Sequence, residues 1–153
     1  MKLFRTAVLL VLAAATGAVR AADPPLVNSL VHFGRVVVPP VARTDVANLV
    51  VAGTLDTDGY RYVVLNLAGE LKSASDAGVL GVMLIPDVPP FDKAFLDRGL
   101  LPVSMELTAT SMPDGRFMAR QQTFEVGFPR YKILLFNSSS TTAAASVFAY
   151  RAR

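Results

Sequence analysis

Short hydrophobic runs alternate with short polar stretches along most of this chain of 153 residues. The runs are rich in β-branched and aromatic residues, and the stretches between them contain glycine, proline, aspartate and asparagine, which favour turns. The candidate strands are residues 30–38, 46–55, 60–67, 79–85, 103–110, 116–126, 130–136 and 143–153. About eight strands at regular spacing predict an all-β fold, an antiparallel β-sandwich of the jelly-roll type. One short helix is expected at 92–98, where Asp92 can cap its start and Gly99 can end it.

Three of the polar stretches are typical of hairpin turns. Residues 56–59 and 112–115 each contain Asp-Gly, which supplies the positive φ that a tight turn needs. Residues 137–142 are mostly serine and threonine, which also favour a turn. We therefore expect the strands on either side of each stretch to pair, most clearly 130–136 with 143–153.

Several runs are hydrophobic at consecutive positions, so that both faces of the strand would be apolar. These runs are 36–38, 49–51, 63–65, 82–85 and 133–136. An open antiparallel sheet usually keeps one face in water and alternates in sequence. Something is therefore expected to cover the second face of at least one sheet, either the loops and short helix of the chain itself or a protein partner or second copy. A lipid-facing barrel fits less well, because prolines punctuate the strands and no aromatic girdles frame them.

The first 21 residues have the pattern of a secretory signal peptide. Lys2 and Arg5 give a basic start, residues 7–15 are an unbroken apolar run, and small residues follow. The apolar run is too short for a membrane-spanning helix, which needs about 20 residues. We expect cleavage after Ala21 or Ala22, a single β-sandwich domain over 22–153 with no membrane span, and a periplasmic or secreted location.

Removing that segment changes the charge balance. The full chain has 15 Lys and Arg against 12 Asp and Glu, for a net charge of +3. Lys2, Arg5 and Arg20 lie in the predicted signal, which leaves basic and acidic residues equal in number. No cluster of Lys and Arg follows, so nucleic-acid binding is not expected. The chain has no cysteine, so disulfides and thiol catalysis are absent and stability must come from the apolar core.

No set of catalytic residues stands out. His32 is the only histidine and no Gly-x-Ser-x-Gly motif accompanies it, so it is interpreted as a strand-surface or core residue. A histidine-based metal site usually needs two or three histidines, and we expect neither a metal nor another cofactor. A hydrolase working with two carboxylates stays open as an alternative, with Glu70, Glu106 and Glu125 among the candidates.

Four residues around the first Asp-Gly turn are the main candidates for ligand binding. Asp56 and Asp58 are oxygen ligands of the kind that calcium takes, although the remaining positions of a calcium loop are missing. Tyr60 and Tyr62 share one strand face at a period of two, which would make a small platform for a sugar ring. The simpler interpretation is a plain turn beside tyrosines that pack on the core.

Arg130 and Tyr131, which begin the candidate strand 130–136 and so precede the last strand, are a similar case, an arginine beside an aromatic ring. In strand number and in its closing C-terminal strand the chain resembles jelly-roll carbohydrate-binding sandwiches, which is a likeness of fold and implies no function. The interpretation favoured by the sequence is an exported, non-catalytic β-sandwich, an envelope or extracellular structural or interaction module that uses a strand face or edge to bind a protein partner or its own copies. The alternative is a carbohydrate-binding module that uses the tyrosine platform.

Overall fold

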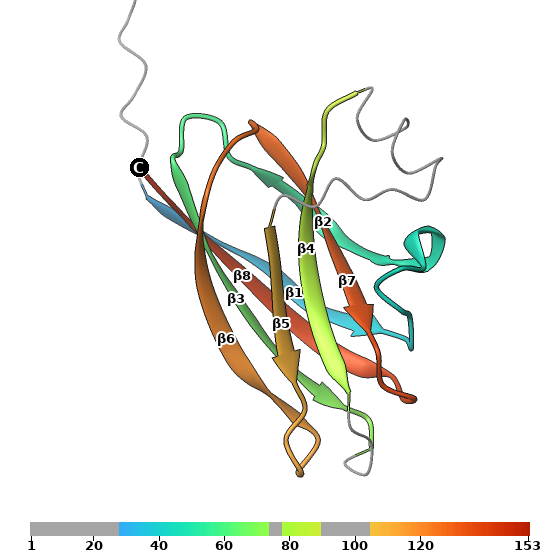
Figure 1. Cartoon of the computed structure of the whole chain (residues 1–153). Coiled ribbons are helices and arrows are strands. Elements are labelled where there is room, and N and C mark those ends of the chain that lie inside the picture. The colour runs from blue at the N-terminus through green and yellow to red at the C-terminus, as the bar shows by residue number, and fades with distance from the viewer. Residues whose placement is uncertain (1–27, 74–77, 90–104) are drawn as a thin grey trace, which may run out of the picture.

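The computed structural model describes residues 28–73, 78–89 and 105–153, and there the chain is almost entirely β-structure (Figure 1). The strands are β1 (Ser29–Val38), β2 (Val50–Asp56), β3 (Tyr62–Leu71), β4 (Val79–Pro86), β5 (Met105–Thr110), β6 (Arg116–Glu125), β7 (Arg130–Asn137) and β8 (Ala143–Ala152). A short 3-10 helix, η1 (Val46–Asn48), precedes β2. The predicted helix at 92–98 and the predicted signal peptide at 1–21 lie outside the described residues.

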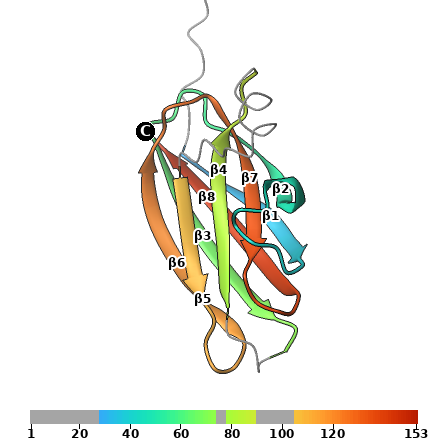
Figure 2. The same ribbon diagram turned by 45° about the vertical axis from the view of Figure 1, so that its right-hand side comes forward.

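The strands form two four-stranded layers packed face to face (Figures 1 and 2). Sheet A has the order β1-β8-β3-β6, and sheet B has the order β2-β7-β4-β5. In the described chain the first strand pairs with the last, the second with the seventh, the third with the sixth and the fourth with the fifth, all antiparallel. This nested pairing is the strand order of a jelly roll. The predicted fold class is therefore confirmed.

The predicted hairpins are wrong. β2 and β3, β5 and β6, and β7 and β8 each lie in opposite sheets, so the turns at 56–59, 112–115 and 137–142 are corners between the two layers. Turn residues specify that the chain reverses, but they do not specify which strand becomes the neighbour. Burial decides the pairing here, because two sheets that each have one apolar face must place those faces against each other.

The core lies between the two sheets and follows the alternation of each strand. In β3 the inward side chains Val63, Leu65 and Leu67 have no exposed surface, whereas the residues between them are half-buried. In β5 the inward residues are Met105, Leu107 and Ala109, and they alternate along the strand with more exposed polar residues. The predicted strand at 60–67 corresponds to β3, which lies inside sheet A with partners on both sides.

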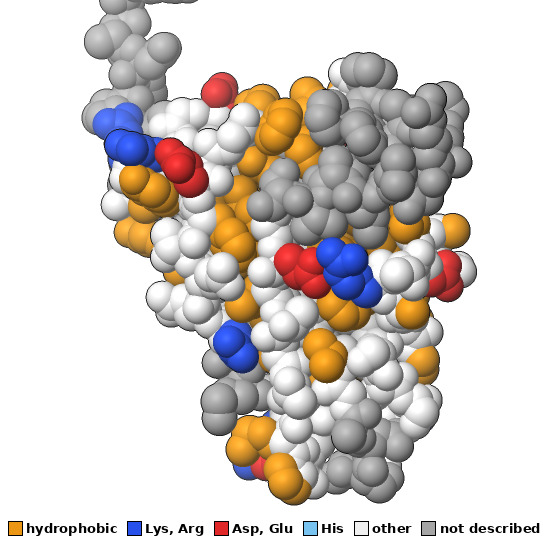
Figure 3. Space-filling model, in the orientation of Figure 1, with side chains coloured by type: hydrophobic (Ala, Val, Ile, Leu, Met, Phe, Trp, Pro, Cys, Tyr) orange, Lys and Arg blue, Asp and Glu red, His pale blue; other side chains and the backbone are white. Residues whose placement is uncertain are grey.

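The outer face of sheet B is also buried over β4 and β7, which accounts for the hydrophobic runs at 82–85 and 133–136. Met83 and Ile85 have no exposed surface on this face, and Leu134 and Phe136 are 5% and 4% exposed. Their cover is part of the same chain. Arg43, in the connection between β1 and β2, reaches Glu106 on β5 with bonds of 2.7 to 3.0 Å, in the row that contains Leu134 and Met83. Figure 3 views the molecule from this side, where charged groups are scattered among hydrophobic and uncharged ones.

Candidate interaction face

The outer face of sheet A differs from that of sheet B, because several of its hydrophobic side chains are in contact with solvent. Leu30 and Val37 on β1 are 63% and 65% exposed, and Tyr150 on β8 is 38% exposed. Among the described residues, the other large hydrophobic side chains with comparable exposure are Val51 on β2 and Met112 in the β5–β6 corner. The outer face of sheet A is therefore where exposed apolar surface gathers, and it is the candidate interaction face.

One half of this face carries bulky side chains and is called here the aromatic end. The register places Leu30, Tyr150 and Val64 in one row across β1, β8 and β3. In the next row, the His32 ring stacks on Phe148 with the ring centroids 4.2 Å apart and the planes 5° from parallel. Of the two positions expected for His32, strand surface or core, the structure shows the strand surface, where its partner is an aromatic ring.

The other half of the face is a hollow, because the two central strands carry small residues there. Its floor consists of Ala68, Gly69, Ala144 and Ser146. Its rim consists of Arg35 and Val37 on β1, Glu70 on β3 and Arg116 on β6. Two adjoining depressions of about 520 and 180 Å³ occupy it.

Charged groups at the hollow are paired with one another. Arg35 forms an ion pair with Glu70 across β1, β8 and β3. Arg116 is 2.6 Å from the carboxylate of Asp114 in the β5–β6 corner, and it lowers the pKa of that carboxyl by hydrogen bonds from its guanidinium and its backbone N–H. Both pairs are largely exposed, so each contributes little to stability.

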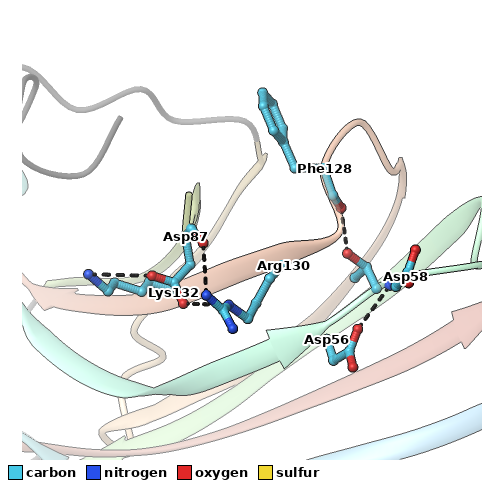
Figure 4. A network of polar contacts seen from close by, with 7 residues as sticks. Asp56, Asp58, Asp87, Phe128, Arg130 and Lys132 are labelled. Carbon is cyan, nitrogen blue, oxygen red and sulfur yellow. Dashed lines mark hydrogen bonds and ion pairs between the residues drawn. The ribbon is translucent and has the colours of Figure 1, made fainter. Parts of the chain in front are cut away.

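The residues predicted as ligand-binding lie at one end of the sandwich, where the β2–β3 corner meets the β6–β7 connection. Figure 4 shows three of them, Asp56, Asp58 and Arg130. The Asp56 carboxylate accepts a hydrogen bond of 3.0 Å from the backbone N–H of Asp58. Thr57 is buried, and its hydroxyl donates a hydrogen bond of 2.6 Å to the carbonyl of Phe128, which connects the β2–β3 corner to the β6–β7 connection. An open depression of about 400 Å³ lies beside this corner and is lined by Asp58 and Tyr60, among others.

Tyr60 and Tyr62 each lie under an arginine. The Arg151 guanidinium is 4.7 Å from the centroid of the Tyr60 ring, and the Arg61 guanidinium is 5.2 Å from that of Tyr62. Arg151 also donates to the carbonyl of Asp56 at 2.7 Å and to the hydroxyl of Ser29 at 2.6 and 2.8 Å. Arg151 thereby connects the ends of β8, β1 and β2, and its guanidinium also packs on the Tyr60 ring.

Arg130 and Tyr131 point to opposite faces of β7. Tyr131 is 1% exposed, and its hydroxyl accepts hydrogen bonds of 3.0 Å from the backbone N–H groups of Gly127 and Phe128. Arg130 is exposed and pairs with Asp87 at 2.8 Å, as does Lys132 at 3.6 Å. The structure therefore places Tyr131 in the core, Arg130 in a surface ion pair, and the two side chains apart.

The glutamates considered for a carboxylate pair lie in three separate places. Glu70 is paired with Arg35, Glu106 with Arg43, and Glu125 with Arg61 at 3.9 Å. Glu70 and Glu125 are at opposite ends of the β3–β6 pair, and Glu106 is on the other sheet. The hydrogen bonds from Arg43 to Glu106 raise the pKa of the Arg43 guanidinium.

The described part of the chain also bears on two other kinds of site, a metal centre and a membrane span. There, no cluster of three or more histidine, cysteine, aspartate or glutamate residues is placed to hold a metal ion. In those same segments, no helix has the length and apolar character needed to cross a bilayer.

The face described above could not be read from the sequence, because it depends on strand register. The sequence signals that belong to it are the small residues at 143–146 and two pairs of bulky side chains, Leu30 with His32 and Phe148 with Tyr150, each two apart on one strand face. They indicate a strand with one small-residue half and one bulky half. Only the pairing of β8 with β1 and β3 brings these halves onto one surface.

No protein-family model matches the sequence, and no curated protein matches it. Similar solved structures include a chain of the Israeli acute paralysis virus full particle heated to 63 degrees, which is 11% identical over 97% of this chain and 83% of that one, with a TM-score of 0.48. A crystal structure of the same virus is 15% identical over 94% and 83%, with a TM-score of 0.44. The VP2 subviral particle of infectious bursal disease virus is 10% identical over 87% of this chain and 37% of that one, with a TM-score of 0.43. The jelly-roll assignment itself rests on the strand order of this chain.

Proposed function

We propose that this protein is an exported, non-catalytic β-sandwich that serves as a structural or interaction module in the cell envelope or outside the cell, and that it binds its protein partner through the outer face of sheet A. The observation that carries the proposal is the contrast between the two outer faces. The chain buries Met83 and Ile85 on sheet B completely, but leaves Leu30 and Val37 on sheet A more than half exposed. Burying apolar surface is worth about 25 cal/mol per Å², so a partner on this face gains free energy that the lone chain leaves unused.

Two exposed valines make a matched test of this face. Val37 lies on the outer face of sheet A and Val51 lies on β2 of sheet B, with exposures of 65% and 59%. A photo-reactive phenylalanine analogue placed at position 37 is expected to cross-link a partner in the intact producing cell, whereas the same group at position 51 is expected to stay unlinked. Adducts at position 51 alone, or at neither position, would contradict the proposal.

The export part of the proposal rests on the pattern of residues 1–21. Mass spectrometry of the protein from its producing cell is expected to give a mature N-terminus directly after Ala21 or Ala22, in the periplasmic or culture fraction. A chain that keeps Met1 and stays with the cytoplasm would overturn this part and leave the interaction face to be judged by the cross-linking test.

A carbohydrate-binding module is the second candidate, and the depression of about 400 Å³ beside Asp58 and Tyr60 favours it. A glycan array with the purified protein tests it, together with Tyr60→Ala and Tyr62→Ala. Loss of glycan binding in either variant, with an unchanged melting temperature, supports a site at this end of the sandwich. Glycan binding that survives both changes places the sugar elsewhere.

A further inference from the structure

We propose that the partner of sheet A is a second copy of this chain, packed face to face with the strands of the two copies antiparallel and related by a two-fold axis that crosses the strands. This rests on the proposed function, because it names the occupant of the same face. Closed dimers use the same patch on both subunits, so the patch must be complementary to itself. The outer face of sheet A meets that requirement in shape and in charge.

The shape requirement is met because the face is bulky at one end and hollow at the other. Turning a second copy end over end places each aromatic end over the hollow of the other copy. Row by row, Tyr150 then faces Ser146 of the other copy, and Val64 faces Ala68, while Phe148 lies near the axis. Large side chains opposite small ones allow two sheets to interdigitate at the usual spacing of about 10 Å.

The charge requirement is met along β6. Glu125 lies at one end of this strand, beside Tyr62, and Arg116 lies at the other end, beside Glu70. Because they are nine residues apart on one strand, about 30 Å separates them within a single copy and they cannot pair there. The antiparallel arrangement keeps β6 over β6 but reverses its direction, so each Arg116 lies opposite Glu125 of the other copy. Stacking about an axis parallel to the strands would instead place β6 over β1 and give no such pair.

The size of the face is adequate for a modest dimer. Four strands about 4.8 Å apart and about 33 Å long give a projected area of roughly 600 Å² per copy, and side-chain relief increases the accessible area. A standard stable interface buries about 800 Å² per partner. The face also contains polar groups such as Asn66, Gln121 and Thr123, so we expect a reversible dimer.

Charge exchange tests the arrangement through sedimentation of the processed chain. The native protein is expected to be mainly dimeric at about 100 µM. Arg116→Glu and Glu125→Arg each create two like-charge contacts across the axis, so each is expected to weaken dimerisation about 10- to 100-fold. A one-to-one mixture of the two variants restores both contacts, and so does the double variant, and both are expected to return to the dimer.

Asp114→Asn is the matched control, because it removes the ion pair of Arg116 within the chain and leaves Arg116 available to the other copy. Its dimerisation is expected to equal that of the native protein. Circular dichroism checks that each variant is folded. If Arg116→Glu or Glu125→Arg does not fold, the neutral variants Arg116→Gln and Glu125→Gln replace them. The neutral variants are expected to weaken the dimer by a smaller factor.

Two results would overturn the inference: a native chain that is monomeric at about 100 µM, or a mixture of the two reversals that stays monomeric. The cross-link at position 37 keeps this failure separate from failure of the proposed function. An adduct of twice the chain mass supports the second copy. An adduct with a different protein rejects the second copy and retains the interaction face, whereas no adduct rejects both.

Discussion

The ring of Phe136 lies so close over Gly81 that a Cβ added to the glycine would be 2.0 Å from the ring carbon Cε1. The two residues are cross-strand neighbours on β7 and β4, on the outer face of sheet B. The absence of a side chain at Gly81 is what gives the Phe136 ring room on this face, where Phe136 is 4% exposed. Glycine is needed here for close approach and not for backbone freedom.

Gly81→Ala is therefore expected to destabilise the fold by about 1–3 kcal/mol, because the new methyl group overpacks against Phe136. Urea unfolding measures the loss. Combined with Phe136→Leu, the same change is expected to cost less than the sum of the two single changes. Gly127→Ala is the control, since its added Cβ would have its nearest neighbour at 3.9 Å and is expected to be nearly neutral. Equal losses at both glycines would refute the packing argument.

Asn137 holds the β7–β8 corner from a fully buried position. Its amide donates to the carbonyls of Val38 at 3.1 Å and Thr141 at 2.8 Å, and its oxygen accepts from the hydroxyl of Ser139 at 2.6 Å. Asn137→Ala removes the Asn137 partner of the Val38 carbonyl and of the backbone N–H of Ser139, so we expect a loss of about 2–4 kcal/mol in the free energy of unfolding. Asn66→Ala, on the outer face of sheet A, is expected to change it by less than about 0.5 kcal/mol. Similar values for the two variants would mean that the corner does not depend on this amide.

Arg151 is expected to stabilise the end of the sandwich, because its guanidinium N–H groups donate to residues on both β1 and β2. A double-mutant cycle of Arg151→Ala and Ser29→Ala should give a coupling energy of about 0.5–1.5 kcal/mol, because the hydroxyl of Ser29 accepts two bonds from the guanidinium. Arg151→Lys is expected to retain little of it, because one ammonium cannot reproduce bonds to Ser29 and Asp56 together. Strict additivity in the cycle would show that Arg151 and Ser29 are not coupled.

Asp114 is expected to titrate below its ordinary pKa of 3.8, because the guanidinium and then the backbone N–H of Arg116 hydrogen-bond its charged form. A lowered pKa means that the contribution of this carboxylate to folding is present above about pH 3.8 and is lost as the pH falls through the lowered value. Carbon-detected NMR titration of the Asp114 carboxyl measures this. Arg116→Ala should move the pKa back toward 3.8, and an unchanged midpoint would assign the shift to another cause.

The fold class was predictable because it is encoded in local patterns that survive in the folded chain. The alternation in β5 gives its inward face, and the continuous hydrophobic runs of β4 and β7 correspond to the sheet that is buried on both sides. The strand pairing was not predictable from turns. Asp58-Gly59 makes a tight turn as expected, with a bond of 3.0 Å from the N–H of Tyr60 to the carbonyl of Thr57, yet the strands on either side separate into different layers.

The candidate interaction face also depends on strand pairing, which the sequence does not specify. Arg130 and Tyr131 were predicted as a candidate binding pair, but the position of Tyr131 in β7 points it into the core, where its hydroxyl accepts hydrogen bonds from two backbone N–H groups. Conversely, Ala144 and Ser146 carry no chemical signal in the sequence and become the floor of a hollow once β8 lies between β1 and β3. The shape of this binding surface depends on which side chains the strand register places next to one another, so it can be recognised only once the strand pairing is known.

The central place of β8 in sheet A has a consequence for biosynthesis. A nascent chain that has been made only as far as β7 has both neighbours of β8, β1 and β3, but lacks the strand that joins them. Such a chain cannot complete sheet A, so formation of the two-sheet sandwich must wait until residues 143–152 have left the ribosome. If the proposed export takes place before sheet A is complete, the polypeptide reaches the translocation channel in the unfolded form that such a channel accepts.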